Sequence, residues 1–235
     1  MKILGIDSSG IVASAALIDE DRLIAEYTIN NKKTHSETLL PMIASLLEAV
    51  DVDINDVDAI AIAAGPGSFT GLRIGAATAK GLAMAIDKPI IPVPTCEGLT
   101  YNLYGNSGLV CPVMDARRNQ VYTGIYSFIK KSNEKVVSET IMDEVPMDIN
   151  ELIDILNEKG ESVTFLGDGV PVYKDAIREG MKVPFCFAPI SFSLQKASSI
   201  ALLGYEYYKE GKAVHVDEFA PIYLRKSQAE RESGR

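Results

Sequence analysis

The stretch between residues 58 and 86 constrains the fold more than any other part of the sequence. Residues 58–64 form a continuous apolar run of strand length, and residues 72–86 carry alanine and glycine at helical spacing. The seven residues between them, 65–71, are Gly-Pro-Gly-Ser-Phe-Thr-Gly. A buried strand followed by a glycine loop and a helix rich in small residues is typical of an α/β protein, because such a helix packs closely on a sheet.

The first part of the chain contains further elements of the same kind. Residues 2–7, 11–18 and 22–29 predict three successive strands joined by tight turns. A capping box at residues 34–37 predicts the start of a helix whose apolar stripe runs to residue 50. Strands and helices therefore alternate from the N-terminus onwards.

The second half of the chain repeats this order, and Asp115 ends its first strand as Asp7 ends that of the first half. This rhythm indicates two similar α/β lobes, although any α/β protein alternates in this way, so both explanations stay open. The predicted elements are strands at 109–115, 120–129, 134–141 and 162–166, a helix near 148–158, and a terminal helix at 193–210 with Leu194, Ala197, Ala201, Tyr205 and Tyr208 on one face.

The predicted boundary between the lobes falls near residues 100–108, where turn-forming residues gather. The division is a first lobe at 1–103, which carries the partner-binding helices, and a second lobe at 104–225. Residues 226–235 are expected to form a polar tail.

Charge and cysteine content limit the partners and the compartment. The 23 basic and 32 acidic residues give a formal net charge of −9, and such a surface repels a phosphate backbone, so another subunit must hold any RNA. Cys96, Cys111 and Cys186 lack the close spacing of a zinc site and cannot all pair, which favours a reducing, cytoplasmic location. Asp7 interrupts the first apolar run and no later run approaches roughly 18 residues, so neither export nor a membrane span is expected.

Two turns offer groups that could face an anion. In Asp7-Ser8-Ser9-Gly10, exposed amides of small residues can wrap a phosphate while Asp7 holds a water or a metal ion. The same residues also make an ordinary hairpin turn, and the matching Asp115 is what strengthens the ligand interpretation.

The glycine loop permits close backbone approach at a helix start, but it matches neither the dinucleotide-binding nor the P-loop pattern. Arg73 in the first turn of the following helix opposes the helix dipole. We therefore expect Arg73 to face a carboxylate of this chain or of a partner, or a bound anion, with the carboxylate favoured.

Positive evidence for a metal centre or a nucleophile is lacking in the sequence. His35 and His215 are its two histidines, and Leu39 occupies the position where a helical metal pair with His35 needs its second ligand. His35 is therefore expected to be an exposed residue of the first helical turn. There is no Gly-x-Ser-x-Gly elbow and the cysteines lie in apolar or proline-flanked contexts, so no catalytic residue is predicted.

The first predicted helix carries a candidate partner surface. Leu39, Leu40, Ile43 and Leu47 form an apolar stripe that is ordinarily part of a core. Pro41 removes one backbone hydrogen bond inside the helix and bends its axis, so the stripe can stand off its own sheet and face another chain. Glutamate at Leu40 or Ile43 is predicted to abolish partner binding without unfolding, and unfolding would assign the stripe to the core.

Six motifs, in this order along the chain, resemble those of the bacterial TsaB (YeaZ) family and together span nearly its whole length. The most specific is the glycine motif at residues 65–75. The motifs are Ile6-Asp7-Ser8-Ser9, His35-Ser36-Glu37 through Leu40-Pro41, Gly65-Pro66-Gly67-Ser68-Phe69-Thr70-Gly71-Leu72-Arg73-Ile74-Gly75, Asp115-Ala116-Arg117, Gly167-Asp168-Gly169 and Pro221-Ile222-Tyr223-Leu224-Arg225.

The resemblance implies an α/β, actin-like and sugar-kinase-like (ASKHA) fold of two βββαβα lobes, each a mixed sheet flanked by helices. It implies a role in making threonylcarbamoyladenosine next to the anticodon of tRNAs that read codons starting with A. In that family the chain is a non-catalytic partner of a larger paralogue, TsaD, which carries a metal site and transfers threonylcarbamoyl from an adenylate. A small ATPase, TsaE, joins them, and tRNA is contacted only through the complex.

The resemblance also implies where the partner binds. The first helix, around Leu39, Leu40, Ile43 and Leu47, and the helix after the glycine loop, which carries Arg73, would form a helical bundle shared with TsaD. When the partner is missing, the same surface would pair with a second copy in a homodimer, because an exposed apolar face tends to be covered.

A vestigial nucleotide cleft is implied at Asp7, Ser8, Asp115 and Gly167. Asp168 adds a negative charge that a phosphate avoids, although the neighbouring residues Arg117 and Arg118 can offset it. Weak or absent nucleotide binding is therefore expected, with no required cofactor and with ATP or ADP accommodated at the interface of the complex.

Two other classes of function stay open. The Asp-ended strands and the glycine loop also suit an independent ATP-dependent kinase of the actin-like superfamily, which calorimetric titration with ATP or ADP decides. A metallopeptidase would need ligands that the sequence does not supply, and metal analysis of the pure protein decides that case.

Overall fold

The computed structural model describes residues 1–31, 34–132 and 136–225. The predicted strands and helices of the first part of the chain are present, and the strands that begin at residues 3, 13 and 59 are buried along their whole length. A strand at Ile90–Pro94 and a short helix at Thr95–Thr100 were not predicted. Its elements are β1 (Ile3–Asp7), β2 (Ala13–Ile18), β3 (Leu23–Ile29), α1 (His35–Ala49), β4 (Ala59–Gly65), α2 (Phe69–Ile86), β5 (Ile90–Pro94) and α3 (Thr95–Thr100), with short 3₁₀ turns at Ile54–Asp56 and Tyr101–Leu103.

The second part differs from the prediction in three places. The third strand continues to Asp148 because it pairs with its neighbour over this whole length, the terminal helix is divided in two, and a helix and a strand occur between residues 170 and 187. The elements are β6 (Leu109–Asp115), β7 (Gln120–Lys130), β8 (Val136–Asp148), α4 (Ile149–Lys159), β9 (Val163–Leu166), α5 (Val170–Gly180), β10 (Phe185–Phe187), α6 (Ile190–Ser193) and α7 (Ala197–Lys209).

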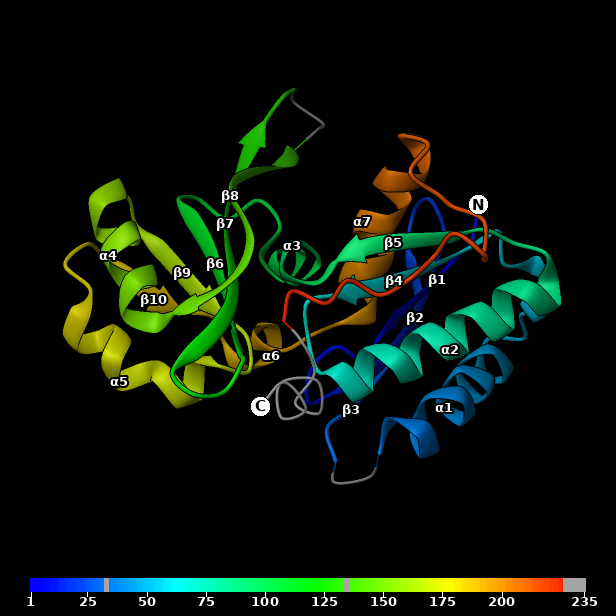
Figure 1. Cartoon of the computed structure of the whole chain (residues 1–235). Helices are drawn as coiled ribbons and strands as arrows, with labels where there is room; N and C mark the ends of the chain where they lie inside the picture. The colour runs from blue at the N-terminus through cyan, green and yellow to red at the C-terminus, as the bar shows by residue number, and fades with distance from the viewer. Residues whose placement is uncertain (32–33, 133–135, 226–235) are drawn as a thin grey trace.

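The two sheets have the same topology. The strand order is β3-β2-β1-β4-β5 in the first and β8-β7-β6-β9-β10 in the second. In each sheet the first three strands of the chain are antiparallel, and the later two are parallel to the first strand. This repetition confirms the predicted duplication and the actin-like arrangement of two lobes, which lie side by side (Figure 1).

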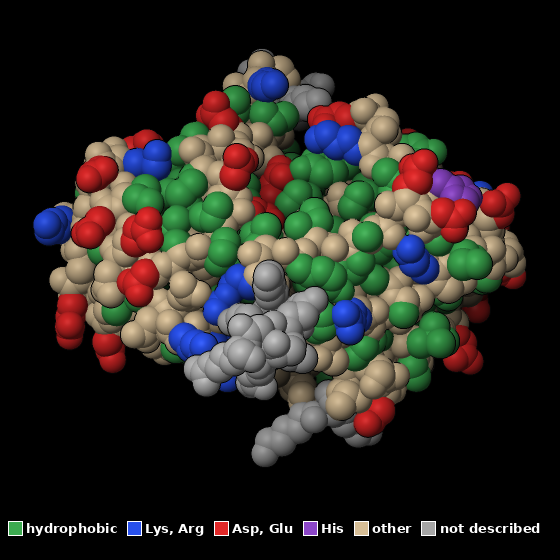
Figure 2. Space-filling view, in the orientation of Figure 1, with side chains coloured by type: hydrophobic (Ala, Val, Ile, Leu, Met, Phe, Trp, Pro, Cys, Tyr) green, Lys and Arg blue, Asp and Glu red, His purple; other side chains and the backbone are tan. Residues whose placement is uncertain are grey.

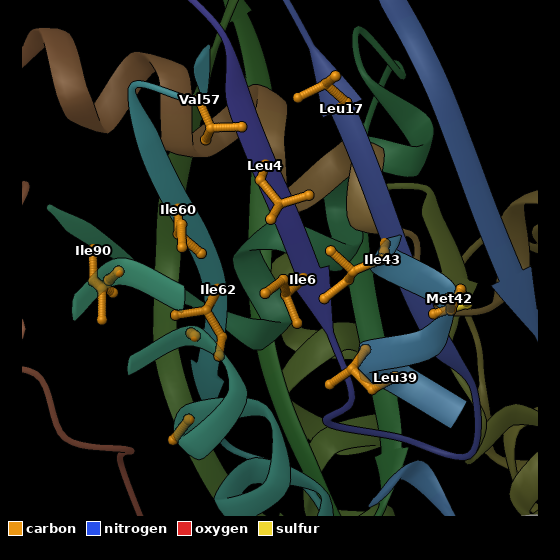
Figure 3. Packing of buried hydrophobic residues seen from close by; sticks show 14 of the residues in the cluster. Leu4, Ile6, Leu17, Leu39, Met42, Ile43, Val57, Ile60, Ile62 and Ile90 are labelled. Carbon is orange, nitrogen blue, oxygen red and sulfur yellow. The ribbon is translucent and has the colours of Figure 1, made fainter. Parts of the chain in front are cut away.

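Helices cover both faces of the first sheet (Figure 1). Successive side chains of a strand point to opposite faces, so Leu4 and Ile6 pack towards α1 and α2, while Ile3 packs towards α7. Figure 3 shows Leu39 and Ile43 of α1 directed at these strands. Helices α1 and α2 therefore share one face of the sheet and leave their outer sides to solvent.

The start of α1 does not form the predicted capping box. Thr34 is the N-cap residue, but its hydroxyl lies 2.9 Å from Ser36 Oγ and makes no bond to a backbone amide of the helix. The helix depends instead on its packing, because five of its side chains are buried against the sheet.

Helix α7 belongs to the first lobe, which corrects the predicted division at residue 104. Ile200, Ala201 and Leu203 cluster with Ile3 and with residues of β4 and β5. Helix α7 packs on the face of the first sheet that α1 and α2 do not cover, and so buries the apolar side chains there. The polar tail at 226–235 lies outside the described residues.

The buried face of α7 was predicted only in part. Ala197 and Ala201 are buried as expected, but Leu194 precedes the helix and Tyr208 is 37% exposed. Gly204 also faces the sheet, where a Cβ would lie 2.5 Å from that of Ala61. The remaining buried residues of the helix are Ser199, Ile200 and Leu203.

Helix α3 joins the two lobes at their back. The Glu144 carboxylate on β8 accepts a hydrogen bond from the Glu97 amide at 3.0 Å. The Glu97 carboxylate accepts one from Ser138 Oγ at 2.8 Å and one from Tyr207 Oη of α7 at 2.6 Å. These bonds connect the second sheet, α3 and α7.

No helix within the described ranges is long and apolar enough to cross a membrane.

The buried amide of Gln195 provides a test of the packing where the chain re-enters the first lobe. The side chain is 1% exposed, and neither amide atom has a hydrogen-bond partner among the described residues. Gln195→Met removes the cost of this buried polar group, so we expect stability to rise by about 1 kcal/mol and the melting temperature by about 2 to 4 °C. Gln195→Glu, which buries a charge, should lower the melting temperature. Calorimetry that shows a lower melting temperature for Gln195→Met would mean that the amide is satisfied.

Candidate functional site

A cleft of about 640 Å³ lies between the lobes. It forms where β1 and β6, the equivalent first strands of the two sheets, end, and the carboxyl ends of such strands are where α/β proteins commonly bind ligands. The turn after β1, the glycine loop, the turn after β6 and the segment 222–225 line it. Asp115 and Asp168 contribute carboxylates to its wall.

Asp7 and Ser8 lie behind the wall of this cleft. Both are buried, and the Asp7 carboxylate accepts hydrogen bonds from the Ser9 amide at 2.9 Å and from Ser9 Oγ at 2.6 Å. Ser8 Oγ donates to the Gly71 carbonyl at 2.9 Å. Burial raises the pKa of Asp7 to about 6, against the lowering effect of the bonds from Ser9. The polar groups of this turn are therefore engaged within the fold.

The glycine loop packs against the same turn. The Ser68 amide donates to the Ser9 carbonyl at 2.7 Å, and Ser68 Oγ caps α2 by accepting from the Gly71 amide at 3.3 Å. A Cβ at Gly67 would collide with the Ser9 carbonyl, and one at Gly71 with the Ser8 carbonyl. The glycines thus allow two backbone segments to touch, which is a different use from the anion site that the sequence left open.

In the second lobe, Asp115 occupies the position equivalent to that of Asp7 but is more exposed to solvent. Asp115 is 24% exposed, and its carboxylate accepts from the Arg117 amide at 2.8 Å and from Tyr173 Oη at 3.2 Å. The Asp168 carboxylate accepts from the Asp115 amide at 3.2 Å, and burial raises the pKa of Asp168. Gly167, at φ 112°, donates its amide to the Ser193 carbonyl at 2.7 Å.

The predicted nucleotide residues are therefore brought to one region, but they do not share one cavity. Of Asp7, Ser8, Asp115 and Gly167, Asp115 is the one that lines the cleft. The order of the strands in the sequence correctly indicated that these residues lie near one another. The sequence could not show that the polar groups of the turns form hydrogen bonds within the fold.

His35 differs from its expected exposed position. It is half-buried, and its Nε2 lies 3.0 Å from the Gly10 carbonyl, which it joins as a donor. It thereby ties the start of α1 to the turn after β1. Within the described ranges, no group of three or more His, Cys, Asp and Glu side chains is placed to hold a metal ion.

The predicted partner stripe on α1 is wrong for three of its four residues. Leu39 and Ile43 are each 1% exposed and Leu47 is 8% exposed, and all three belong to the core of the first lobe. Pro41 lies within the helix without lifting the stripe from the sheet. Leu40, which points the other way, is 53% exposed.

An exposed surface runs along the outer sides of α1 and α2, the two helices that the resemblance assigns to partner binding, although the sequence analysis did not name most of its residues. It contains Leu40 and Met84, which is 66% exposed, together with the small exposed residues Ala44, Ala77 and Gly81. We call these five residues the outer helix face. The spacing of residues 77, 81 and 84 is a helical signal that could have indicated it.

Within the chain, Arg73 contacts an aromatic ring, so the predicted internal carboxylate is replaced by Phe69, while a partner carboxylate or an anion stays a prediction. Its guanidinium carbon lies 4.0 Å from the centroid of the Phe69 ring, a cation–π distance. The Phe69 ring in turn lies 4.7 Å from that of Tyr223. This favourable contact offsets the unfavourable place of a cation at a helix start.

Comparison with known proteins gives consistent results. A model of the TsaD family, described as tRNA N6-adenosine threonylcarbamoyltransferase, matches residues 22–233. The tRNA threonylcarbamoyladenosine biosynthesis protein TsaB of Bacillus subtilis is 37% identical to this chain. The alignment covers 98% of this chain and 96% of the Bacillus subtilis protein. The tRNA N6-adenosine threonylcarbamoyltransferase of Novosphingobium aromaticivorans is 38% identical but covers only 41% of this chain and 33% of its own.

A solved structure supports the same relationship. A protein from Pseudomonas aeruginosa, described as similar to peptidase YeaZ, superposes with a TM-score of 0.79 and 27% identity. The superposition covers 95% of this chain and 99% of that one. Nearly the whole of the two-lobed fold is therefore shared.

Two glycine substitutions test the role assigned to the glycine loop. Gly71→Ala should destabilise the fold by about 2 to 4 kcal/mol, because its Cβ meets the Ser8 backbone and cannot be relieved by a side-chain movement. Gly81→Ala is the matched control on the same helix, where nothing lies within 4 Å of the added Cβ, and it should stabilise by up to about 1 kcal/mol. Urea unfolding measures both. Equal stability of the two variants would contradict the packing role.

The buried Asp7 carboxyl predicts a pH dependence. Its pKa is raised from 3.8 to about 6 by burial, so the folded state binds the proton more tightly than the unfolded chain. The associated stability is present below about pH 4 and is lost as the pH rises through about 6, by roughly 3 kcal/mol.

Urea unfolding between pH 4 and pH 7 measures this loss. Asp7→Asn should show a smaller fall than the unsubstituted protein, while the exposed control Asp21→Asn should not differ from it. An unchanged profile for Asp7→Asn would rule out this origin of the pH dependence.

Proposed function

This chain belongs to the TsaB (YeaZ) family within the wider TsaD family, and we propose that it is a non-catalytic subunit that binds and supports a larger TsaD-like paralogue. Its role lies in the biosynthesis of threonylcarbamoyladenosine in tRNA. The observation that carries the proposal is coverage: this chain matches a TsaB protein over 98% of its length, but a threonylcarbamoyltransferase over 41%.

The geometry of the cleft supports a subunit without chemistry of its own. The Asp7 carboxylate and the Ser8 hydroxyl are bonded inside the fold, and the Gly167 amide is bonded to Ser193. Asp115 and Asp168 line the cleft with carboxylates that a phosphate would have to approach. We expect any ATP or ADP used in the reaction to bind in the complex with the partner and not to this chain alone.

The outer helix face is the proposed binding surface for the paralogue. Leu40 and Met84 supply exposed apolar contacts, and Ala44, Ala77 and Gly81 are small enough for another helix to approach closely. A second copy of this chain would use the same surface when the paralogue is missing, in an isologous pair. A TsaE-like ATPase completes the complex.

The proposal is tested by co-expressing the chain with the larger paralogue of its own host. A stoichiometric complex by native mass spectrometry, and modification of tRNA that depends on this chain, are the expected results. Full modification by the paralogue alone would overturn the proposal.

Single glutamate substitutions locate the surface. Leu40→Glu should weaken partner binding at least a hundredfold and leave the melting temperature unchanged, because a charge would be buried in the interface. Ile43→Glu, in the core, should unfold the chain. Ile190→Glu is the control, since Ile190 is 96% exposed but lies on α6. Calorimetry and pull-down measure these effects, and undiminished binding by Leu40→Glu would refute the assigned surface.

A further inference from the structure

Arginine and aromatic side chains follow one another around the mouth of the cleft. Arg73 lies over Phe69, and Phe69 stacks against Tyr223. Two residues further along the chain, Arg225 donates from Nη1 to the Ala116 carbonyl at 2.6 Å, which brings it beside Arg117. The cleft rim comprises Arg73, Phe69, Tyr223, Arg225, Arg117 and Arg118.

The rim is basic although the protein as a whole is acidic, with a net charge of −9. Figure 2 shows blue side chains next to the grey atoms in the lower centre of this face, and both blue and red side chains elsewhere on it. Four arginines from three separate parts of the chain are thus gathered at one place. The net charge of the whole chain does not reveal such a local concentration of arginines.

The arginines retain donors for a ligand. The Arg117 side chain is 89% exposed, and its Nε lies 3.8 Å from the Asp115 carboxylate, a weak contact. Arg118 is also exposed. A guanidinium has five N–H donors, so a single bond such as that from Arg225 to Ala116 leaves the others available.

The loop that carries two of these arginines has an unusual backbone. Arg117, Arg118 and Asn119 have φ values of 65°, 58° and 58°, all in the left-handed region that non-glycine residues rarely adopt. Backbone strain of this kind gathers at functional sites, where the surroundings maintain it for a purpose. Here it turns two arginines outwards at the edge of the cleft.

The aromatic pair adds a flat apolar platform next to the charges. Tyr223 is 41% exposed, and its ring lies beside the half-buried Phe69. Arginines that contact phosphates next to aromatic rings that stack on bases are the combination by which proteins hold single-stranded nucleic acid. A protein partner with acidic residues would need the arginines but not the stacked rings.

We propose that the cleft rim is this chain's own contact surface for tRNA, with phosphates on the arginines and an unpaired base on the Tyr223–Phe69 pair. The inference rests on the proposed function and changes the expectation that tRNA is contacted by other subunits alone. Asp115 and Asp168 on the cleft wall repel phosphate, so the RNA lies across the mouth and does not enter.

The test uses the complex of this chain with its larger paralogue and an unmodified tRNA transcript that reads a codon starting with A. Fluorescence anisotropy at several KCl concentrations gives the affinity and its salt dependence. Arg117→Gln/Arg118→Gln should lower the slope of log K against log[KCl] by about 1 to 2. Tyr223→Leu should weaken binding about tenfold and leave the slope unchanged.

Arg178→Gln/Lys182→Gln is the matched control, since it removes two exposed positive charges elsewhere on the second lobe and should change neither quantity. An unchanged slope for Arg117→Gln/Arg118→Gln would overturn the inference. ATP binding by the isolated chain that this double variant abolishes, with tRNA affinity intact, would do so too, because the rim would then serve a free nucleotide.

The failure of this inference is distinct from that of the proposed function. If the unsubstituted complex forms and modifies tRNA while the rim variants bind tRNA normally, the subunit role holds and the rim has no part in it. If no complex forms, the subunit role itself fails.

Discussion

The contact between the turn after β1 and the start of α2 determines most of what this protein presents to other molecules. The Ser68 amide donates to the Ser9 carbonyl and the Ser8 hydroxyl donates to the Gly71 carbonyl, so the turn after β1 and the glycine loop are held together. This junction directs α2 across the sheet next to α1. It also forms one wall of the cleft, so the outer helix face and the cleft both follow from it.

The same junction engages groups that a phosphate-binding turn would leave free. A phosphate-binding turn needs free amides, but here the amide of Ser9 serves Asp7 and that of Ser68 serves Ser9. The buried Asp7 carboxylate, with its raised pKa, is held by the chain itself and does not face a ligand. What the cleft keeps open is its mouth, where arginines and aromatic rings gather.

Helix α3 adds a second set of contacts between the lobes. Its contacts through Glu97 and Glu144 connect the second sheet to α7, and burial raises the pKa of Glu144 to about 7. The lobes are therefore held by hydrogen bonds at the back as well as by the chain crossings.

The sequence by itself determined the elements and their order, because apolar runs, glycine loops and small-residue helices are local patterns. It also indicated the duplication, and the motifs around Gly65–Gly75 pointed to the family. It could not decide which side of α1 meets the sheet: Ile43 and Leu40 look equally apolar, and only packing assigns one to the core and the other to solvent. Likewise, the return of α7 to the first lobe, the bond from His35 to Gly10 and the meeting of Arg73, Phe69 and Tyr223 join residues far apart in the chain. Such contacts depend on which faces remain uncovered once the sheets have formed, and this is decided by the tertiary structure alone.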